Sequence, residues 1–412
     1  MITYDKFQLE NGLRVIVHKD TSTPVAAVNI LYDVGARDED ENKTGFAHLF
    51  EHLMFGGSVN IPNYDSPLQM AGGENNAFTS NDITNYYITL PANNLETAFW
   101  LESDRMLSLA FSEKSLEVQR NVVIEEFNQR YLNQPYGDVW LLLRPLCYKV
   151  HPYKWNTIGK NIQHIEDVKM EDVKSFFKKF YCPDNAVLVV AGNVETDEVK
   201  QLCKKWFEPI PRGNTPKRNL PQEPVQTEKR FLEVERKVPV DAIYKTYHIG
   251  KRTDENFYTV DIISEILSRG NSSRLYQKLV KEQKIFSEID AYHSGDLDEG
   301  LFIFSGKPAK GVSLHDAEPA INSEIENIKT EIVSERELQK VKNKIESTFV
   351  FSEMSVLNKA MTLALFELLG DAAMINSEIK KYLAVTPEKI QKVAKNIFTE
   401  NNSSVLYYRA AK

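Results

Sequence analysis

Apolar and polar residues alternate in several short stretches of the chain, and between these stretches apolar residues recur every three to four positions. The first pattern predicts half-buried β-strands and the second predicts amphipathic helices. In the first half, strands are expected at residues 13–18, 26–34, 84–90 and 186–191, and helices at 46–55, 95–107, 115–132 and 170–181. This mixture fits the α+β class best, with antiparallel-rich sheets packed with helices.

Two pairs of similar segments indicate a duplication. Residues 24–35 (PVAAVNILYDVG) are similar to residues 239–250 (PVDAIYKTYHIG), which lie 215 positions further on. Residues 170–193 align with residues 387–410 at an offset of 217. Each of these longer segments predicts an amphipathic helix, a polar turn and an apolar strand. Two matches at nearly the same offset predict two homologous α+β domains.

A polar segment near the middle of the chain, PIPRGNTPKRNLPQEPVQT at residues 209–227, contains five prolines. This composition excludes a helix or a central strand and is typical of a linker. A chain of 412 residues is also too long for one hydrophobic core. We therefore expect a first domain at residues 1–208, a linker at 209–227 and a homologous second domain at 228–412.

The segment GFAHLFEHLMFGGS, residues 45–58, carries the clearest chemical motif. His48 and His52 are four residues apart, so a helix places both imidazoles on one face, where a single ion can accept a nitrogen from each. Glu51 reaches the same face and can lie beside the metal without binding it. This H-x-x-E-H pattern is the reverse of the H-E-x-x-H zinc motif. It predicts a catalytic zinc site in the first domain, with Glu51 as the base.

The third metal ligand must come from another segment. A catalytic zinc ion has three protein ligands and an open position for water, whose pKa it lowers towards ~7. On the helix predicted at residues 116–130, the buried stripe consists of Leu116, Val123 and Phe127. Glu126 lies beside this stripe and Glu125 is turned about 100° away. Periodicity alone favours Glu126 as the third ligand, with Glu125 as the alternative. A further alternative is that both glutamates form a solvated pair on an exposed face and neither binds the metal. These ligands favour Zn²⁺, although Mn²⁺ or Co²⁺ can substitute.

Together these features resemble the pitrilysin family of zinc peptidases, which includes insulin-degrading enzyme and the mitochondrial processing peptidase. The resemblance covers nearly the whole chain and is to the half-length, processing-peptidase-like bacterial type. Besides the metal helix, it rests on NGLRVIV (11–17), GGENNAFTSNDITNYYITLP (72–91), QRNVVIEEF (119–127) and YCPDNAVLVVAGNV (181–194). In QRNVVIEEF the second glutamate, Glu126, falls on the family's third-ligand position.

The resemblance implies a zinc endopeptidase that hydrolyses unstructured peptides inside a chamber, of which this chain forms one half of a clamshell. Family substrates add a strand to a sheet edge. Here that edge would include Asn76, Ala77, Phe78 and Thr79. A glutamate often supports the family's metal site seven residues before the third ligand. This chain has Gln119 there, which can still support the ligands through a hydrogen bond.

The second half departs from the first at the metal positions. At the offset of 215, the residues that correspond to His48, Glu51 and His52 are Ile263, Ile266 and Leu267. All three are apolar, so we expect the second domain to hold no metal. An alternative function for the whole chain is a non-catalytic structural or assembly subunit of the same fold. The intact set of ligands and base in the first half favours the peptidase.

Active family members also carry an Arg and a Tyr, seven residues apart, that grip the substrate. The matching positions here are Val280 and Ser287, and Arg274 and Tyr276 lie nearby but out of register. The resemblance therefore implies that a homologous subunit supplies these groups in a heterodimer. A homodimer is the alternative.

Composition argues against several other kinds of protein and site. The net charge of −8 argues against nucleic-acid binding, which needs a basic face. Cys147, Cys182 and Cys203 form no C-x-x-C pair, so neither a disulfide framework nor a thiolate zinc site is expected. No segment has the ~18 apolar residues of a membrane span. The N-terminus shows no signal-peptide pattern. We expect a cytoplasmic protein, or a periplasmic one if a signal peptide has been removed.

Overall fold

The computed structural model describes residues 1–215 and 217–411, which form two compact units. The first unit consists of Met1–Arg130, Trp155–Leu220 and Val350–Ser377, and the second of Tyr131–Lys154, Pro221–Phe349 and Glu378–Lys412. One crossing between the units, at Leu220 and Pro221, falls inside the predicted linker. Two segments, 131–154 and 350–377, belong to the unit formed mainly by the other half of the sequence. The division into residues 1–208, 209–227 and 228–412 stays a prediction about the duplicated halves.

The first unit contains a six-stranded sheet with the order β1-β2-β6-β3-β5-β4. β2 and β6 are parallel, and the other neighbouring pairs are antiparallel. β6 is apolar and buried at every position, as expected for a strand covered on both faces. The strands are β1 (Asp5–Gln8), β2 (Arg14–Lys19), β3 (Val25–Tyr32), β4 (Glu74–Thr79), β5 (Thr84–Pro91) and β6 (Ala186–Gly192).

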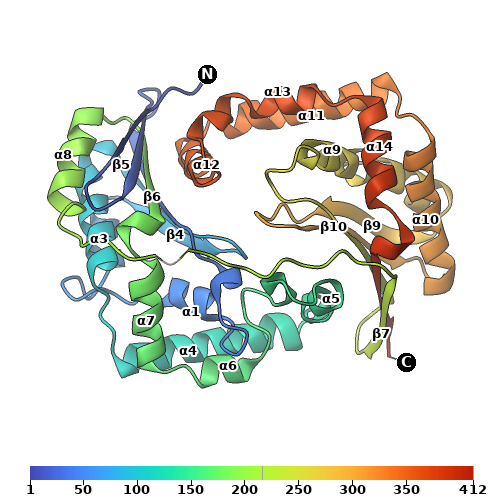
Figure 1. The fold of residues 1–412 in the computed structure, drawn as a ribbon, viewed down its shortest axis with the longest axis horizontal. Helices are drawn as coiled ribbons and strands as arrows, with labels where there is room; N and C mark the ends of the chain where they lie inside the picture. Colours follow the sequence, from blue (N-terminus) through green and yellow to red (C-terminus); the bar gives the residue numbers. More distant parts are fainter. Residues whose placement is uncertain (216, 412) are drawn as a thin grey trace. The chain divides into compact units, whose positions relative to one another are not determined.

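Helices cover this sheet on both sides. α12 contacts β3 and β6, while α3 and α8 lie on the opposite side (Figure 1). α1 packs against α4 and also contacts the edge strand β4. The helices of this unit are α1 (Phe46–Leu53), α2 (Asp65–Met70), α3 (Leu95–Leu107), α4 (Glu113–Phe127), α6 (Ile162–Glu166), α7 (Met170–Phe180), α8 (Thr196–Trp206) and α12 (Val356–Leu368).

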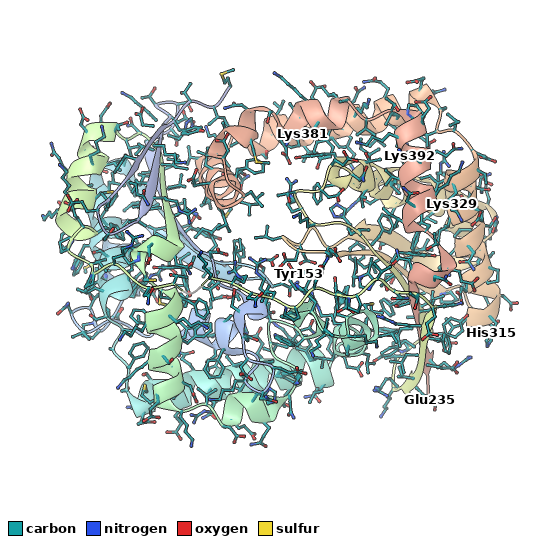
Figure 2. The ribbon with its side chains drawn as sticks, in the orientation of Figure 1. Tyr153, Glu235, His315, Lys329, Lys381 and Lys392 are labelled. Carbon is teal, nitrogen blue, oxygen red and sulfur yellow. The ribbon has the colours of Figure 1, made fainter. Side chains whose placement is uncertain are left out.

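The second unit contains a five-stranded sheet with the order β7-β11-β8-β10-β9. Consecutive residues of its strands enter two different core clusters. Phe302 and Phe304 of β10 pack on one side, and Leu301 and Ile303 pack on the other, together with α5 and with Tyr153, which Figure 2 labels. The strands are β7 (Arg230–Arg236), β8 (Ala242–His248), β9 (Phe286–His293), β10 (Leu301–Pro308) and β11 (Ser403–Ala410). The helices are α5 (Val139–Cys147), α9 (Phe257–Ser268), α10 (Leu314–Thr330), α11 (Glu335–Ser352), α13 (Glu378–Leu383) and α14 (Pro387–Ile397).

The two sheets share one connectivity. The order β7-β11-β8-β10-β9 reproduces β2-β6-β3-β5-β4, with a parallel pair at the corresponding place. α7 and α14 begin and end 217 residues apart, as the sequence match predicts. The predicted α+β class, with two homologous antiparallel-rich halves, is confirmed.

The eight elements predicted in the first half are present, but several of their ends differ. The strand predicted at 26–34 ends at Tyr32, and the helix predicted at 115–132 begins at Glu113. The helix predicted at 46–55 ends at Leu53, and beyond it the N–H groups of Phe55 and Gly56 bond to carbonyls only three residues back, at 3.2 and 3.0 Å. The helix predicted at 115–132 is α-helical only to Phe127 and continues as a π-helical turn, Asn128–Leu132. Among the described helices, none is by itself long and apolar enough to cross a membrane. Only α11 and α12 taken together have the necessary length and composition, and they are bent by 108° at their junction.

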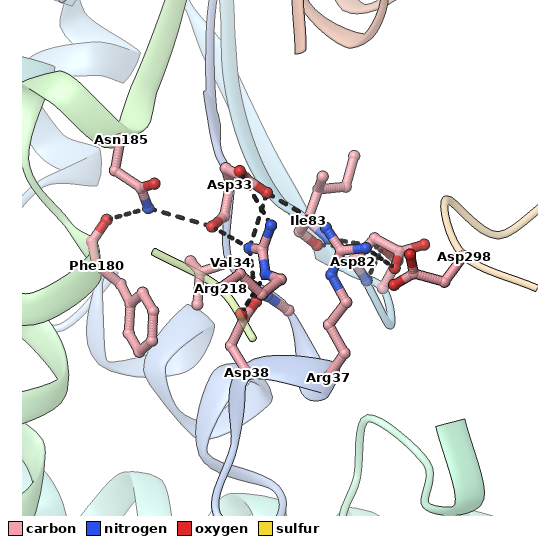
Figure 3. A network of polar contacts seen from close by, with 12 residues as sticks. Asp33, Val34, Arg37, Asp38, Asp82, Ile83, Phe180, Asn185, Arg218 and Asp298 are labelled. Atoms are coloured by element: carbon pink, nitrogen blue, oxygen red, sulfur yellow. Dashed lines mark hydrogen bonds and ion pairs between the residues drawn. The ribbon is translucent and has the colours of Figure 1, made fainter. Parts of the chain in front are cut away.

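Arg218 attaches the predicted linker to the first unit. Its guanidinium donates hydrogen bonds to the carboxylates of Asp33 and Asp38 over 2.7–3.2 Å (Figure 3). Nη2 of Arg218 also donates to the backbone carbonyl of Asp33 at 2.9 Å. Arg37 belongs to the same network and pairs with Asp82 at 3.0 Å. These contacts fix the segment 33–38, which leads directly to Glu39 beside the motif helix.

Candidate metal centre

The motif helix α1 is oriented by its apolar face. Its buried side chains are Phe46, Ala47, Leu49, Phe50 and Leu53. Phe50 packs at ring-centroid distances of 4.5–6.0 Å against Phe176, Phe177 and Tyr181. His48, Glu51 and His52 are only partly buried and occupy the remaining face. Burial of the apolar face therefore turns the three motif residues in one direction.

The N-terminus of α1 is capped by Glu39. The first position, Gly45, has no side chain and a φ of 90°, and an added Cβ would lie 2.6 Å from Cδ1 of Ile165. The buried Glu39 carboxylate accepts hydrogen bonds from the N–H of Gly45 at 3.0 Å and of Ala47 at 2.8 Å. Burial raises the pKa of Glu39 to about 8, although the two N–H donors lower it. Glu39 thus satisfies helix N–H groups that would otherwise be unpaired.

We expect Glu39→Ala to lower the free energy of unfolding by at least about 2 kcal/mol, because two buried N–H groups lose their acceptor. The effect should shrink as the pH rises from 5 to 8. Between pH 4.5 and 8 the carboxyl is ionised in the unfolded chain but keeps its proton in the folded chain, whose pKa is about 8, so its contribution to stability falls as the pH rises through this range. Urea unfolding at several pH values measures both effects. Glu41→Ala, which changes a half-exposed side chain, serves as the control. Equal unfolding midpoints for the two variants would contradict the capping role.

α4 brings Glu126 to the histidine pair. Oε2 of Glu126 lies 3.6 Å from Nε2 of His48 and 3.5 Å from Nε2 of His52. The two imidazole rings are perpendicular, with centroids 4.9 Å apart. One donor atom from each residue lies within 4.8 Å of the others. No other set of three or more His, Cys, Asp or Glu side chains meets this condition within the described residues.

The three donors fit a zinc ion. Ligand atoms placed tetrahedrally about 2.05 Å from zinc are about 3.4 Å apart, close to the 3.5 and 3.6 Å observed here. Two imidazoles and one carboxylate are also a ligand set of catalytic zinc sites, which keep a fourth position open. Nδ1 of His48 is buried without a hydrogen-bond partner among the described residues, and Nε2 is the nitrogen that faces Glu126.

The charge states of the donors also suit a metal, which binds neutral imidazole and ionised carboxylate. Burial lowers the pKa of His48 to about 4, so its ring is neutral near pH 7. The hydrogen bond with His52 holds the pKa of Glu126 below its usual value. Nη1 of Arg130 donates to Oε1 of Glu126 at 2.6 Å. Because Arg130 occupies one oxygen, the other oxygen of Glu126 is directed at the imidazoles.

Glu51 lies beside the donor group. Its Oε2 accepts a hydrogen bond from the hydroxyl of Thr79 at 2.5 Å. Its Oε1 has no hydrogen-bond partner in the described part of the chain. Burial raises the pKa of Glu51, although the hydrogen bond from Thr79 lowers it. A carboxylate with one open oxygen and a raised pKa is suited to accept a proton near neutral pH and to release it again.

The predicted substrate-pairing residues Asn76, Ala77, Phe78 and Thr79 all lie in β4. β4 is an edge strand that pairs with β5 on one side. Asn76 and Phe78 are exposed, whereas Ala77 and Thr79 are half-buried. The open edge therefore ends at the residue whose hydroxyl contacts Glu51.

Two other predicted residues of α4 lie outside the donor group. Gln119 lies seven residues before Glu126, on the same side of α4, and is half-buried. Within the described residues, no hydrogen bond joins its side chain to another group. Its supporting role stays a prediction. Glu125 is exposed, as the periodicity of the helix indicates.

The second unit has no corresponding ligands on α9. Ile263, Ile266 and Leu267 are completely buried in its core. The nearby Arg274 makes a two-pronged ion pair with Glu337, with hydrogen bonds of 3.0 and 2.7 Å. Arg274 is therefore already engaged within its own unit.

The other residues considered for the substrate-gripping pair, Val280, Ser287 and Tyr276, also lie in the second unit. Val280 packs against the core, and the Ser287 hydroxyl donates to the backbone carbonyl of Lys307 at 3.0 Å. Tyr276 lies half-buried in the π-helical segment Tyr276–Glu282. None of these groups is an Arg and Tyr pair with the expected spacing.

Sequence reasoning missed three features of the site. The contact of Arg130 with Glu126 has the i, i+4 spacing of a helical ion pair, so it could have been found. The capping role of Glu39 gives no such signal, because several acidic residues follow one another in RDEDE. The hydrogen bond from Thr79 to Glu51 joins residues 28 positions apart and depends on how β4 packs against α1.

Two family models match the chain. The model described as "Insulinase (Peptidase family M16)" matches residues 14–136, and the model described as "Peptidase M16 inactive domain" matches residues 167–345. The first match contains His48, Glu51, His52 and Glu126. The second contains most of the half in which the corresponding positions are apolar.

Individual proteins are similar over most or nearly all of the chain. "Zinc protease PqqE" of Helicobacter pylori is 28% identical over 98% of this chain and 93% of its own length. A "probable mitochondrial-processing peptidase subunit beta" of Arabidopsis thaliana is 25% identical over 83% of this chain and 66% of its own length. The crystal structure of a protease from Helicobacter pylori has a TM-score of 0.93 and 28% identity, covering 99% of this chain and 100% of that chain. With these matches, the chain belongs to the pitrilysin/insulinase family of peptidases (M16), as a half-length member.

Proposed function

We propose that the chain is a zinc-dependent endopeptidase that hydrolyses unstructured peptides, with Glu51 as the general base. The observation that carries this proposal is the convergence of His48, His52 and Glu126, with an open oxygen of Glu51 beside them. Relatives named as zinc protease and processing peptidase are consistent with it.

The roles of the residues follow from their positions. His48, His52 and Glu126 would hold the ion, and a bound zinc ion supplies a Lewis acid that acidifies water and polarises a carbonyl. Glu51 takes the proton of the attacking water at Oε1 and delivers it to the leaving amine. The raised pKa of Glu51 suits both halves of this transfer. Arg130 binds Oε1 of Glu126, which leaves Oε2 directed at the imidazoles.

The substrate is proposed to bind along β4. An extended peptide can add to an open sheet edge through backbone hydrogen bonds, which favours unfolded segments over particular sequences. Asn76, Ala77, Phe78 and Thr79 would form this edge. Because β4 ends beside Glu51, a peptide paired with it would be led towards the donor group.

We also propose that a homologous subunit completes the substrate site, in a heterodimer or alternatively in a homodimer. Val280 and Ser287 occupy the places of the gripping Arg and Tyr, and Arg274 is paired with Glu337. The Arabidopsis relative is named as a subunit of a processing peptidase. The chain by itself should therefore bind zinc well and hold peptides weakly.

Metal analysis and peptide cleavage test this proposal together. The purified protein should contain about one zinc ion per chain and cleave an unstructured fluorogenic peptide slowly. A chelator should stop cleavage and added zinc should restore it. A homologous subunit without the zinc motif should increase the rate. Absence of zinc would contradict the metal site. Zinc without cleavage, with or without such a subunit, would indicate a structural subunit, and full activity of the isolated chain would contradict the need for a partner.

A further inference from the structure

Thr79 connects the edge strand β4 to Glu51, the proposed base, through a side-chain hydrogen bond. Its hydroxyl oxygen lies 2.5 Å from Oε2 of Glu51, and it is the last residue of β4. Thr79 faces the same side of the strand as Ala77, towards α1, whereas Phe78 between them is exposed. The hydroxyl therefore points away from the exposed side of the strand and towards the motif helix.

The backbone around Thr79 is fixed on both sides. Thr79 lies opposite Thr84 of β5, and the turn that follows is closed by a hydrogen bond of 2.8 Å from the N–H of Ser80 to the carbonyl of Ile83. The same turn accepts hydrogen bonds from the N–H groups of Ala36 and Arg37, at 3.1 and 2.8 Å. These contacts fix the backbone from which the Thr79 side chain projects, and the hydrogen bond to Glu51 holds its hydroxyl.

We propose that Thr79 is a positioning residue for Glu51, in addition to its place in the substrate-pairing strand. A carboxylate on a helix surface can rotate about its side-chain bonds, and each such rotation moves the proton-accepting oxygen. Thr79 removes this freedom by holding Oε2, so that Oε1 is kept available. This inference rests on the proposed function, because it assigns a role to the base of that reaction.

The contact between Thr79 and Glu51 also affects how a bound peptide is positioned relative to the base. Backbone atoms of β4 would pair with the peptide, and a side chain of the same strand holds the base. β4 would therefore position both the peptide backbone and the Glu51 carboxylate, so that a small shift of β4 moves both in the same direction. Positioning of reacting groups to within about 1 Å is worth about 100-fold in rate, which is the scale of effect expected from losing this contact.

Three variants separate positioning from other roles. Thr79→Val keeps the branched shape and the strand preference but removes the hydroxyl. Thr79→Ser keeps the hydroxyl and should rescue the effect. Thr89→Val removes a hydroxyl from the same hairpin, where Thr89 donates to the exposed Glu74 at 3.0 Å, and serves as the matched control.

The first measurement is the crystal structure of each zinc-loaded variant. We expect the Glu51 carboxylate to leave its position in Thr79→Val and to keep it in Thr79→Ser and Thr89→Val, with His48, His52 and Glu126 unchanged. An unmoved Glu51 carboxylate in Thr79→Val would overturn the inference. This comparison decides the inference even if no form of the protein hydrolyses peptides, a result that would overturn the proposed function separately.

The second measurement is steady-state peptide hydrolysis, with the homologous subunit where it is needed. For Thr79→Val we expect kcat to fall about 10- to 100-fold with little change in KM. Thr79→Ser and Thr89→Val should stay within a few-fold of the parent. A rise in KM with unchanged kcat would show that Thr79 acts on the substrate and not on Glu51, and would overturn the inference.

Discussion

Glu51→Gln should lose peptide hydrolysis by about 10²- to 10⁴-fold in kcat, the contribution expected of a general base, while its zinc content stays at the parental level. Glutamine has nearly the same shape, and its amide oxygen can still accept the hydrogen bond from Thr79. It cannot take a proton from water near neutral pH. The loss should therefore appear in turnover and not in metal binding or folding.

The measurement combines kcat for an unstructured peptide with zinc analysis of the same preparation. Thermal unfolding of Glu51→Gln should match the parent or exceed it, because the variant removes a buried carboxylate whose pKa is raised by burial. Hydrolysis at the parental rate would show that another group acts as the base. Loss of zinc would place Glu51 among the ligands instead.

Glu126→Gln should weaken zinc binding by at least about 100-fold, since even supporting groups outside the ligand set change metal affinity by 10- to 100-fold. The substitution removes the one negative charge among the three donors and leaves the two imidazoles in place. It also replaces the ion pair with Arg130 by a weaker hydrogen bond, because the amide oxygen of glutamine can still accept from Arg130 but carries no charge. Peptide hydrolysis should fall in parallel at limiting zinc concentration.

Glu125→Gln is the matched control for this variant. It makes the same chemical change one residue away on α4, where the side chain is exposed and outside the donor group. Competition with a fluorescent chelator measures both affinities. Equal affinities for the two variants would mean that Glu126 is not a ligand, and a larger loss in Glu125→Gln would exchange their roles.

The candidate ligands could be predicted from the sequence because their signals are local. The spacing of His48 and His52 is sufficient to place both rings on one helix face, since each turn has 3.6 residues. The choice of Glu126 over Glu125 required one more step. Val123 and Phe127 are both buried, and this fixes which side of α4 turns inward.

Contacts between distant segments could not be predicted in this way. α12 comes from the second half of the sequence, yet it packs on β3 and β6 of the first unit, and its buried Lys359 pairs with Asp20. Nothing in the apolar pattern of α12 indicates which sheet it covers. The cap formed by Glu39 and the attachment of Arg218 likewise depend on tertiary packing. The duplicated topology was predictable because the two halves repeat the same local patterns at nearly one offset.

The proposed function requires that His48, His52 and Glu126 share one ion. Anomalous diffraction from crystals of the zinc-loaded protein, recorded on both sides of the zinc absorption edge, locates that ion. We predict a single strong peak at about 2.0–2.2 Å from Nε2 of each histidine and from a carboxylate oxygen of Glu126, with Glu51 outside this distance. A peak elsewhere, or none between these three side chains, would show that they do not form a metal site.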